Sequence, residues 1–160
     1  MSLLLAFTLF HTALSLIAIV VGVPVVAELT RGAQSRLTSL FMILAALTSA
    51  TGFLFPFNGI TPAIVVGVIA LVVLALAVIG GGRSTTSPAW RAIRGVSLVA
   101  SLWFLVFVAI AQSFAKIPVL HALAPTQKEP PFGVVQLIVL AGFIFLGVSA
   151  VRRTRRAALA

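Results

Sequence analysis

The sequence predicts an all-α fold, a polytopic bundle of five transmembrane helices in a single domain over residues 1–160. Of the 160 residues, 61% are hydrophobic and only 8% are charged, whereas about a quarter of a soluble domain is charged. The apolar residues form long runs near the ~20 residues that a membrane crossing needs. They do not form the short alternating segments of barrel strands. The expected spans are about residues 3–26, 37–55, 62–80, 94–116 and 132–151.

The basic residues predict the orientation of this bundle. Short cytoplasmic loops retain Lys and Arg. With five spans, every arginine falls on one side of the membrane, and both lysines, Lys116 and Lys128, fall on the other. We therefore expect an outside N-terminus and a cytoplasmic C-terminus. The arginines are Arg31, Arg36, Arg83, Arg91, Arg94, Arg152, Arg153, Arg155 and Arg156.

Local signals set the limits of the first three helices. Pro24 near the end of the first span is tolerated where neighbouring helices satisfy the freed backbone groups. Asn58-Gly59 predicts a tight outer turn, followed by Thr61 as N-cap and Pro62 as the first residue of the third helix. Residues 80–82, three glycines, are expected to end that helix by entering left-handed conformations.

The last two helices surround the longest outer loop. Ser87 and Pro88 predict a capped start for the fourth helix, which places Arg91 and Arg94 at headgroup depth. We expect this helix to reach Lys116. Four prolines then punctuate a loop of about fifteen residues, a length at which loops are commonly functional or disordered.

Composition excludes several classes of function. The absence of cysteine rules out disulfides, thiolate catalysis and Cys-ligated metals. The net charge of +9 does not predict nucleic-acid binding, because the basic residues lie in short clusters beside apolar spans and not on one solvated face. We interpret the C-terminal cluster as topology determinants that contact lipid headgroups. That cluster is Arg152, Arg153, Arg155 and Arg156.

A few polar residues near the outer ends of the spans form the candidate site. An ionisable or amide side chain within a span is a candidate for function. We expect these residues to line an outward-facing, ligand-binding polar pocket. The alternative is that the amides and imidazole are hydrogen-bonding glue between helices. The candidates are His11, Asn58, Gln112, Lys116, His121 and Gln136.

The pattern favours a non-catalytic protein with an accessory, assembly or envelope role. Glu28 and Glu129 are expected on opposite sides of the membrane, which excludes paired acid–base catalysis. No cofactor and no metal site is predicted. The first alternative is a facilitated transporter or channel subunit for a small solute. The lesser alternative is a protein that binds b-type haem or quinone through His11, although His121 is expected too far outside to share an iron with it.

Three motifs carry a resemblance over the whole chain. They are Phe53-Leu-Phe-Pro-Phe57, Thr61-Pro62-Ala63, and Leu123-Ala-Pro-Thr-Gln127 followed by Glu129-Pro-Pro-Phe132. They resemble motifs of small, functionally uncharacterised multi-pass proteins of the bacterial inner membrane. The resemblance implies this compartment but no activity, cofactor or catalytic residue. The expected partners are the lipid bilayer and either another membrane subunit or a second copy of the chain, with no nucleic acid.

Overall fold

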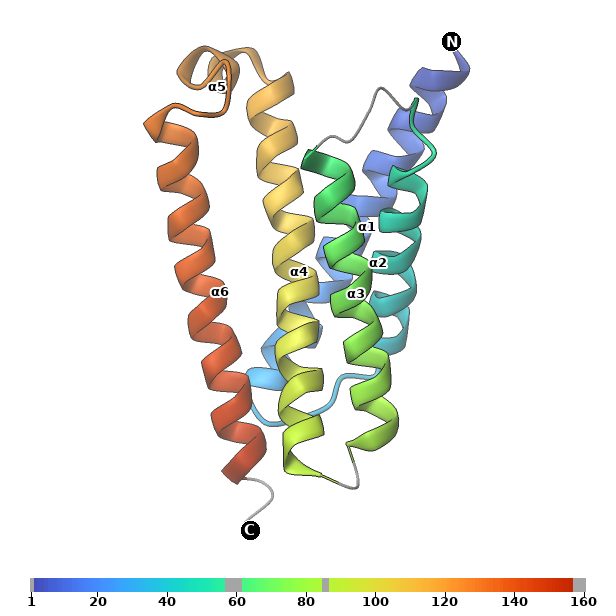
Figure 1. Ribbon diagram of the computed structural model, residues 1–160, viewed down its shortest axis with the longest axis vertical. Helices are drawn as coiled ribbons and strands as arrows, with labels where there is room; N and C mark the ends of the chain where they lie inside the picture. Colours follow the sequence, from blue (N-terminus) through green and yellow to red (C-terminus); the bar gives the residue numbers. More distant parts are fainter. Residues whose placement is uncertain (1, 57–61, 85–86, 157–160) are drawn as a thin grey trace.

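The computed structural model describes residues 2–56, 62–84 and 87–156. These residues form helices and no strand, which confirms the all-α prediction. Five helices lie side by side, and the short helix α5 lies at one end of the bundle, beside the end of α4 and the start of α6 (Figure 1). The helices are α1 Leu3–Thr30, α2 Thr38–Gly52, α3 Pro62–Arg83, α4 Pro88–Lys116, α5 Pro118–Leu123 and α6 Pro130–Arg156.

Four helices, α1, α3, α4 and α6, are long and apolar enough to cross a membrane. Helix α2 is apolar but has only 15 residues, or about 22 Å at ~1.5 Å per residue. Large apolar side chains point outward, including Val20 on α1 and Phe145 on α6, each 70% exposed. An exterior of this kind is compatible with a transmembrane protein, whose surface contacts lipid.

Helix α4 is the centre of the bundle and contacts each of the other helices. Where it meets α1 and α2, the Phe41 ring is fully buried. A Cβ built on Gly22 would lie 2.6 Å from Phe41 Cε2 and 2.7 Å from Leu102 Cδ1. The three helices therefore approach one another closely because position 22 has no side chain, as is usual where membrane helices pack.

The three glycines at the end of α3 do not have the helix-ending role that the sequence predicted. Residues 80–82 do not end the helix, which continues to Arg83, and among the described glycines only Gly32 has a positive φ. A Cβ built on Gly80 would lie 3.0 Å from Arg94 Cβ and 3.1 Å from Arg94 N. Gly80 and Gly81 thus give α3 a surface on which Arg94 of α4 packs closely, whereas a Cβ built on Gly82 would meet nothing within 4 Å. The prediction was wrong because a cap and a packing surface both favour glycine.

Capping motifs fix the ends of two other helices. Helix α1 ends in a Schellman motif, in which Gly32 at φ 83° donates to Leu29 O and Ala33 N donates to Glu28 O, both at 3.0 Å. Ser87 Oγ accepts a hydrogen bond from Ala89 N at the start of α4, which confirms the predicted cap. The predicted turn at Asn58-Gly59 and the Thr61 cap lie outside the described residues.

Candidate functional site

The arginines and lysines lie at opposite ends of the bundle. The start of α1, the end of α4 and α5 share one end, which we call the lysine end (Figure 1). The α1–α2 loop, the α3–α4 connection and the end of α6 share the other, which we call the arginine end (Figure 1). The arginines and lysines, which the sequence predicts on opposite sides of the membrane, are thus also separated in the folded bundle.

At the lysine end, His11 joins α1 to α2. Its Nδ1 lies 2.9 Å from Thr51 Oγ1. Thr51 donates its single hydroxyl hydrogen to Leu47 O at 2.7 Å. Because that hydrogen is already used, His11 Nδ1–H is the donor in the bond to Thr51 Oγ1, and His11 Nε2 takes no part in it. The His11 ring also meets Phe55 edge-on, with centroids 5.2 Å apart. This imidazole therefore acts as an interhelical contact.

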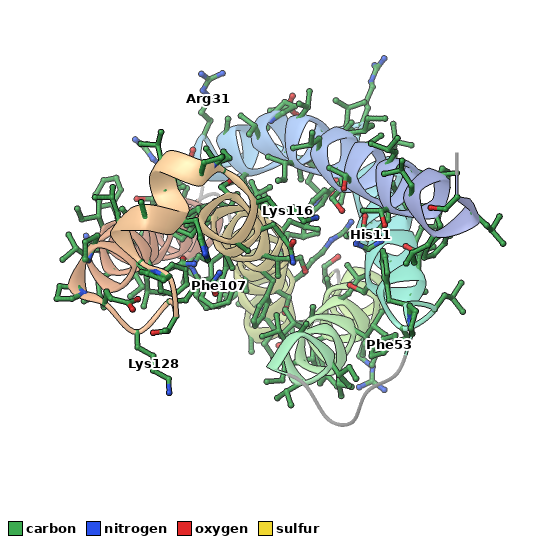
Figure 2. All side chains as sticks on the ribbon, turned by 90° about the horizontal axis from the view of Figure 1, so that it is seen from above. His11, Arg31, Phe53, Phe107, Lys116 and Lys128 are labelled. Carbon is green, nitrogen blue, oxygen red and sulfur yellow. The ribbon has the colours of Figure 1, made fainter. Side chains whose placement is uncertain are left out.

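Lys116 shares the space beside His11. The two side chains face the same region between α1, α2 and α4 (Figure 2), and they are near enough to interact electrostatically. Lys116 itself is exposed. These two predicted pocket residues interact although they belong to different helices.

The other predicted pocket residues differ in burial and in their hydrogen-bond partners. Gln136 on α6 is buried and donates from Nε2 to Phe107 O of α4 at 3.1 Å, while its Oε1 is buried without a partner. Gln112 is exposed, and so is His121 on α5. Asn58 lies outside the described residues. Among the described residues, no hydrogen bond joins His11, Gln112 and Gln136 to one another.

The loop after α5 is held in one conformation by Glu129 and Gln127, and we call residues 117–129 the cap. Glu129 accepts hydrogen bonds from Thr126 N, from Thr126 Oγ1 at 2.8 Å and from Lys128 N at 3.1 Å. Partial desolvation raises the pKa of Glu129, but these hydrogen bonds outweigh it and hold the pKa below its ordinary value. Gln127, at φ 58°, donates from Nε2 to Ala111 O of α4 at 2.7 Å. The loop is therefore fastened to α4.

At the arginine end the structure shows a cavity that sequence reasoning did not find. Its volume is about 200 Å³, and it lies between the end of α1, the α1–α2 loop, the start of α2, the end of α3 and the first turns of α4. The lining residues are Leu29, Gly32, Ala33, Gln34, Thr38, Ser84, Arg91, Arg94, Gly95 and Leu98.

Arg91 and Arg94 supply the positive charge of this cavity. Both are half-buried. The Arg94 guanidinium lies against α3, because a Cβ built on Gly81 would be 3.1 Å from its Nη1. The Nε of Arg91 is buried without a hydrogen-bond partner. The expectation from sequence placed both side chains at headgroup depth, and their three-residue spacing on one helix face was the signal that they act together.

Other arginines lie at the same end of the bundle without lining this cavity. Arg83 Cζ lies 4.9 Å from the centroid of the Trp90 ring, a cation–π contact across the α3–α4 connection. Arg152 and Arg153 are exposed at the end of α6. The side chains of Arg155 and Arg156 lie outside the described part of the chain. Glu28 is the one side-chain carboxylate near the arginine end, because Glu129 is in the cap.

Comparison of the chain with family models, with curated proteins and with solved structures gives no match. Among the described residues, no group of three or more His, Asp or Glu side chains is placed to hold a metal ion. Both candidate sites are therefore interpreted from their own geometry.

Proposed function

We propose that the protein is a non-catalytic, multi-pass protein of the bacterial inner membrane with an accessory or assembly role. The chain crosses the membrane five times, its arginine end faces the cytoplasm, and its cap contacts another membrane subunit. The resemblance of its motifs to small bacterial inner-membrane proteins supports the compartment. The proposed role rests on one observation, the exposed apolar side chains of the ordered cap.

The course of the chain supports α2 as the fifth crossing. Helices α1 and α3 run in the same direction, and α2 runs back between them (Figure 1). Exposed apolar side chains continue past both ends of α2, from Leu37 to Leu54. A crossing helix shorter than the hydrocarbon core is accommodated by local thinning of the bilayer at modest cost. A short α2 is therefore compatible with five crossings and the orientation that the arginines favour.

The cap presents apolar side chains on a rigid frame. Val119 is 73% exposed and Leu123 53% exposed, and Ile117 is also exposed. Hydrogen bonds of Glu129 and Gln127 hold the frame, and Ala124 beneath it is fully buried. A surface that is already ordered loses little entropy when a partner binds. This favours a docking role for the cap over a flexible connection.

The orientation can be tested with single cysteines, because the chain has none of its own. Lys128→Cys and Arg36→Cys are exposed positions at opposite ends. A membrane-impermeant maleimide added to intact spheroplasts should label Lys128→Cys, and it should label Arg36→Cys only after permeabilisation. Labelling of both cysteines from outside, or the reverse pattern, would reject the proposed orientation.

The partner can be tested with a photo-reactive amino acid at position 119 in native membranes. Leu137, 66% exposed on α6, is the matched lipid-facing control. We expect a discrete protein adduct from position 119, its loss when Leu123→Asp is added, and only lipid adducts from position 137. Lipid adducts alone from position 119 would show that the cap rests on the bilayer and would contradict the docking role.

A further inference from the structure

We propose that the cavity at the arginine end is a binding site for a phosphate group, held by Arg91 and Arg94. This site is separate from the cap and goes beyond the proposed assembly role. Its existence does not depend on the orientation of the chain. Under the proposed orientation it opens toward the cytoplasmic leaflet.

Arg91 and Arg94 give the cavity a positive charge that a bound anion would neutralise. A guanidinium is charged at every physiological pH and presents donors in a planar fork that matches phosphate geometry. Arg91 Nε is buried and has no hydrogen-bond acceptor, and a buried donor without an acceptor is energetically unfavourable. Glu28 alone cannot neutralise the arginines gathered at this end. An anion in the cavity beside Arg91 and Arg94 would supply the missing negative charge.

The polar groups beside the arginines indicate what else the ligand carries. Thr38 donates its hydroxyl hydrogen to Ser35 O at 2.8 Å, and Ser84 donates its own to Gly81 O at 2.9 Å. Thr38 and Ser84 both line the cavity, and because their hydroxyl hydrogens are already used, these hydroxyls can act toward a ligand only as acceptors. The site thus pairs cationic donors with neutral acceptors. A phosphate group that bears a neighbouring hydroxyl, or that binds with a water, fits this pairing.

The size of the cavity is consistent with one such group. Its volume is about 200 Å³, and a water molecule occupies ~30 Å³ of the liquid. A phosphate and a few waters, or a phosphate with a short polar substituent, would fill it. The ligand can come from two sources with this shared chemistry, an anionic phospholipid headgroup or a free phosphate.

Gly95 offers a way to fill the site without touching the arginines. It is buried in α4 and lines the cavity, and a Cβ built on it meets nothing within 4 Å. Gly142 on α6 has the same open space but is exposed on the outside of the bundle. Gly95→Leu therefore occupies the cavity, and Gly142→Leu is the matched control.

The test measures ligand-dependent thermal stability of the full chain in neutral detergent. The measured quantity is the change in Tm when phosphatidylglycerol, phosphatidylcholine or inorganic phosphate is added. The ionic strength is kept constant. A ligand that binds only the folded state raises Tm with its concentration. We expect one of the two anionic probes to raise the wild-type Tm, with an apparent Kd weakened at least tenfold by Gly95→Leu and unchanged by Gly142→Leu.

Each outcome either tests the proposal or identifies the source of the bound phosphate group. A rise with phosphatidylglycerol but not inorganic phosphate assigns a lipid headgroup, and a rise with inorganic phosphate assigns a free phosphate. Arg91→Gln is the second variant, should Gly95→Leu fail to fold, and it should weaken binding to a similar extent, whereas the exposed Arg152→Gln should not. No rise in the wild type, or an equal rise in Gly95→Leu and Arg91→Gln, would overturn the proposal.

Discussion

The two ends of the bundle use their polar residues in opposite ways. At the lysine end, His11, Gln127 and Gln136 each bond to a neighbouring segment of the same chain. At the arginine end, Arg91 and Arg94 line a cavity instead. The difference teaches that polar residues predicted within spans can serve to join helices, while residues that look like topology determinants can form a site.

The physical reason is the low dielectric of the bundle. A buried neutral group needs one hydrogen bond, which a backbone carbonyl of an adjacent helix can supply. A buried guanidinium needs a counter-charge as well. The chain has too few carboxylates to supply one. At the lysine end the chain itself supplies hydrogen-bond partners for His11, Gln127 and Gln136, whereas for the arginine end we propose that a ligand supplies the counter-charge.

The largest effect is expected at Gly80, where the arginine end is assembled. In Gly80→Ala the new Cβ would lie 3.1 Å from Arg94 N and 3.2 Å from Arg94 Cα, and backbone atoms cannot move aside cheaply. We expect a loss of about 1–3 kcal/mol of unfolding free energy, measured by chemical unfolding in micelles. Gly82→Ala is the control, since nothing lies within 4 Å. Equal stability of the two variants would show that the α3–α4 contact does not fix the arginines.

A smaller effect is expected for His11→Ala at the lysine end. The variant loses the bond to Thr51 and the edge-on contact with Phe55, worth together about 0.5–2 kcal/mol in a membrane bundle. The same unfolding measurement checks it, with the exposed Thr12→Ala on the same helix as control. A stable His11→Ala protein that has lost a biological activity would instead make His11 a functional residue.

A local effect is expected at Glu129 in the cap. Because its pKa is lowered in the folded chain, the ionised carboxylate stabilises the cap above its ordinary pKa of about 4.3, and this stabilisation is lost as pH falls through the lowered value. The amide signals of Thr126 and Lys128 should change in one step below pH ~4.3 in an NMR titration. Glu129→Gln should remove the step. A step at or above the ordinary value would contradict the hydrogen-bonded cap.

The smallest effect is expected for Gln136→Leu. The substitution removes one bond to Phe107 O but also removes the buried Oε1 that has no partner. The Phe107 carbonyl keeps its usual helical donor four residues on. Replacing a half-satisfied buried amide by an apolar group of similar size should change the unfolding free energy by less than about 0.5 kcal/mol. A loss above ~2 kcal/mol would show that Gln136 is more than interhelical glue.

Much of the fold is predictable because its signals are local. Apolar runs locate the helices, Ser87 marks the start of α4, and the charges separate the two ends. Gln112 shows the limit of periodicity. Gln112 was expected to line the outer polar pocket. Its spacing places it on the same face of α4 as Ser97 and Ser101, yet those serines are buried and Gln112 is exposed. Periodicity gives the direction of a side chain about its helix but not the neighbour that covers it.

The arginine cavity was not predictable, because its lining comes from separate stretches of the chain. Leu29, Thr38, Ser84 and Arg91 belong to four different segments that only the packed bundle brings together. The helical glycines at 80–82 were misread for a related reason. The role of Gly80 and Gly81 depends on Arg94 of the next helix, which no local pattern shows.

The most direct test of the contrast between the two ends is a count of bound phosphate groups. Native mass spectrometry measures this number. The full chain is incubated with phosphatidylglycerol or inorganic phosphate and then released from neutral detergent. We predict one retained phosphate-bearing adduct on the wild type and on Gly142→Leu, and none on Gly95→Leu. The same distribution of adducts on all three proteins would contradict the account, because the arginine end would then be no more a site than the lysine end.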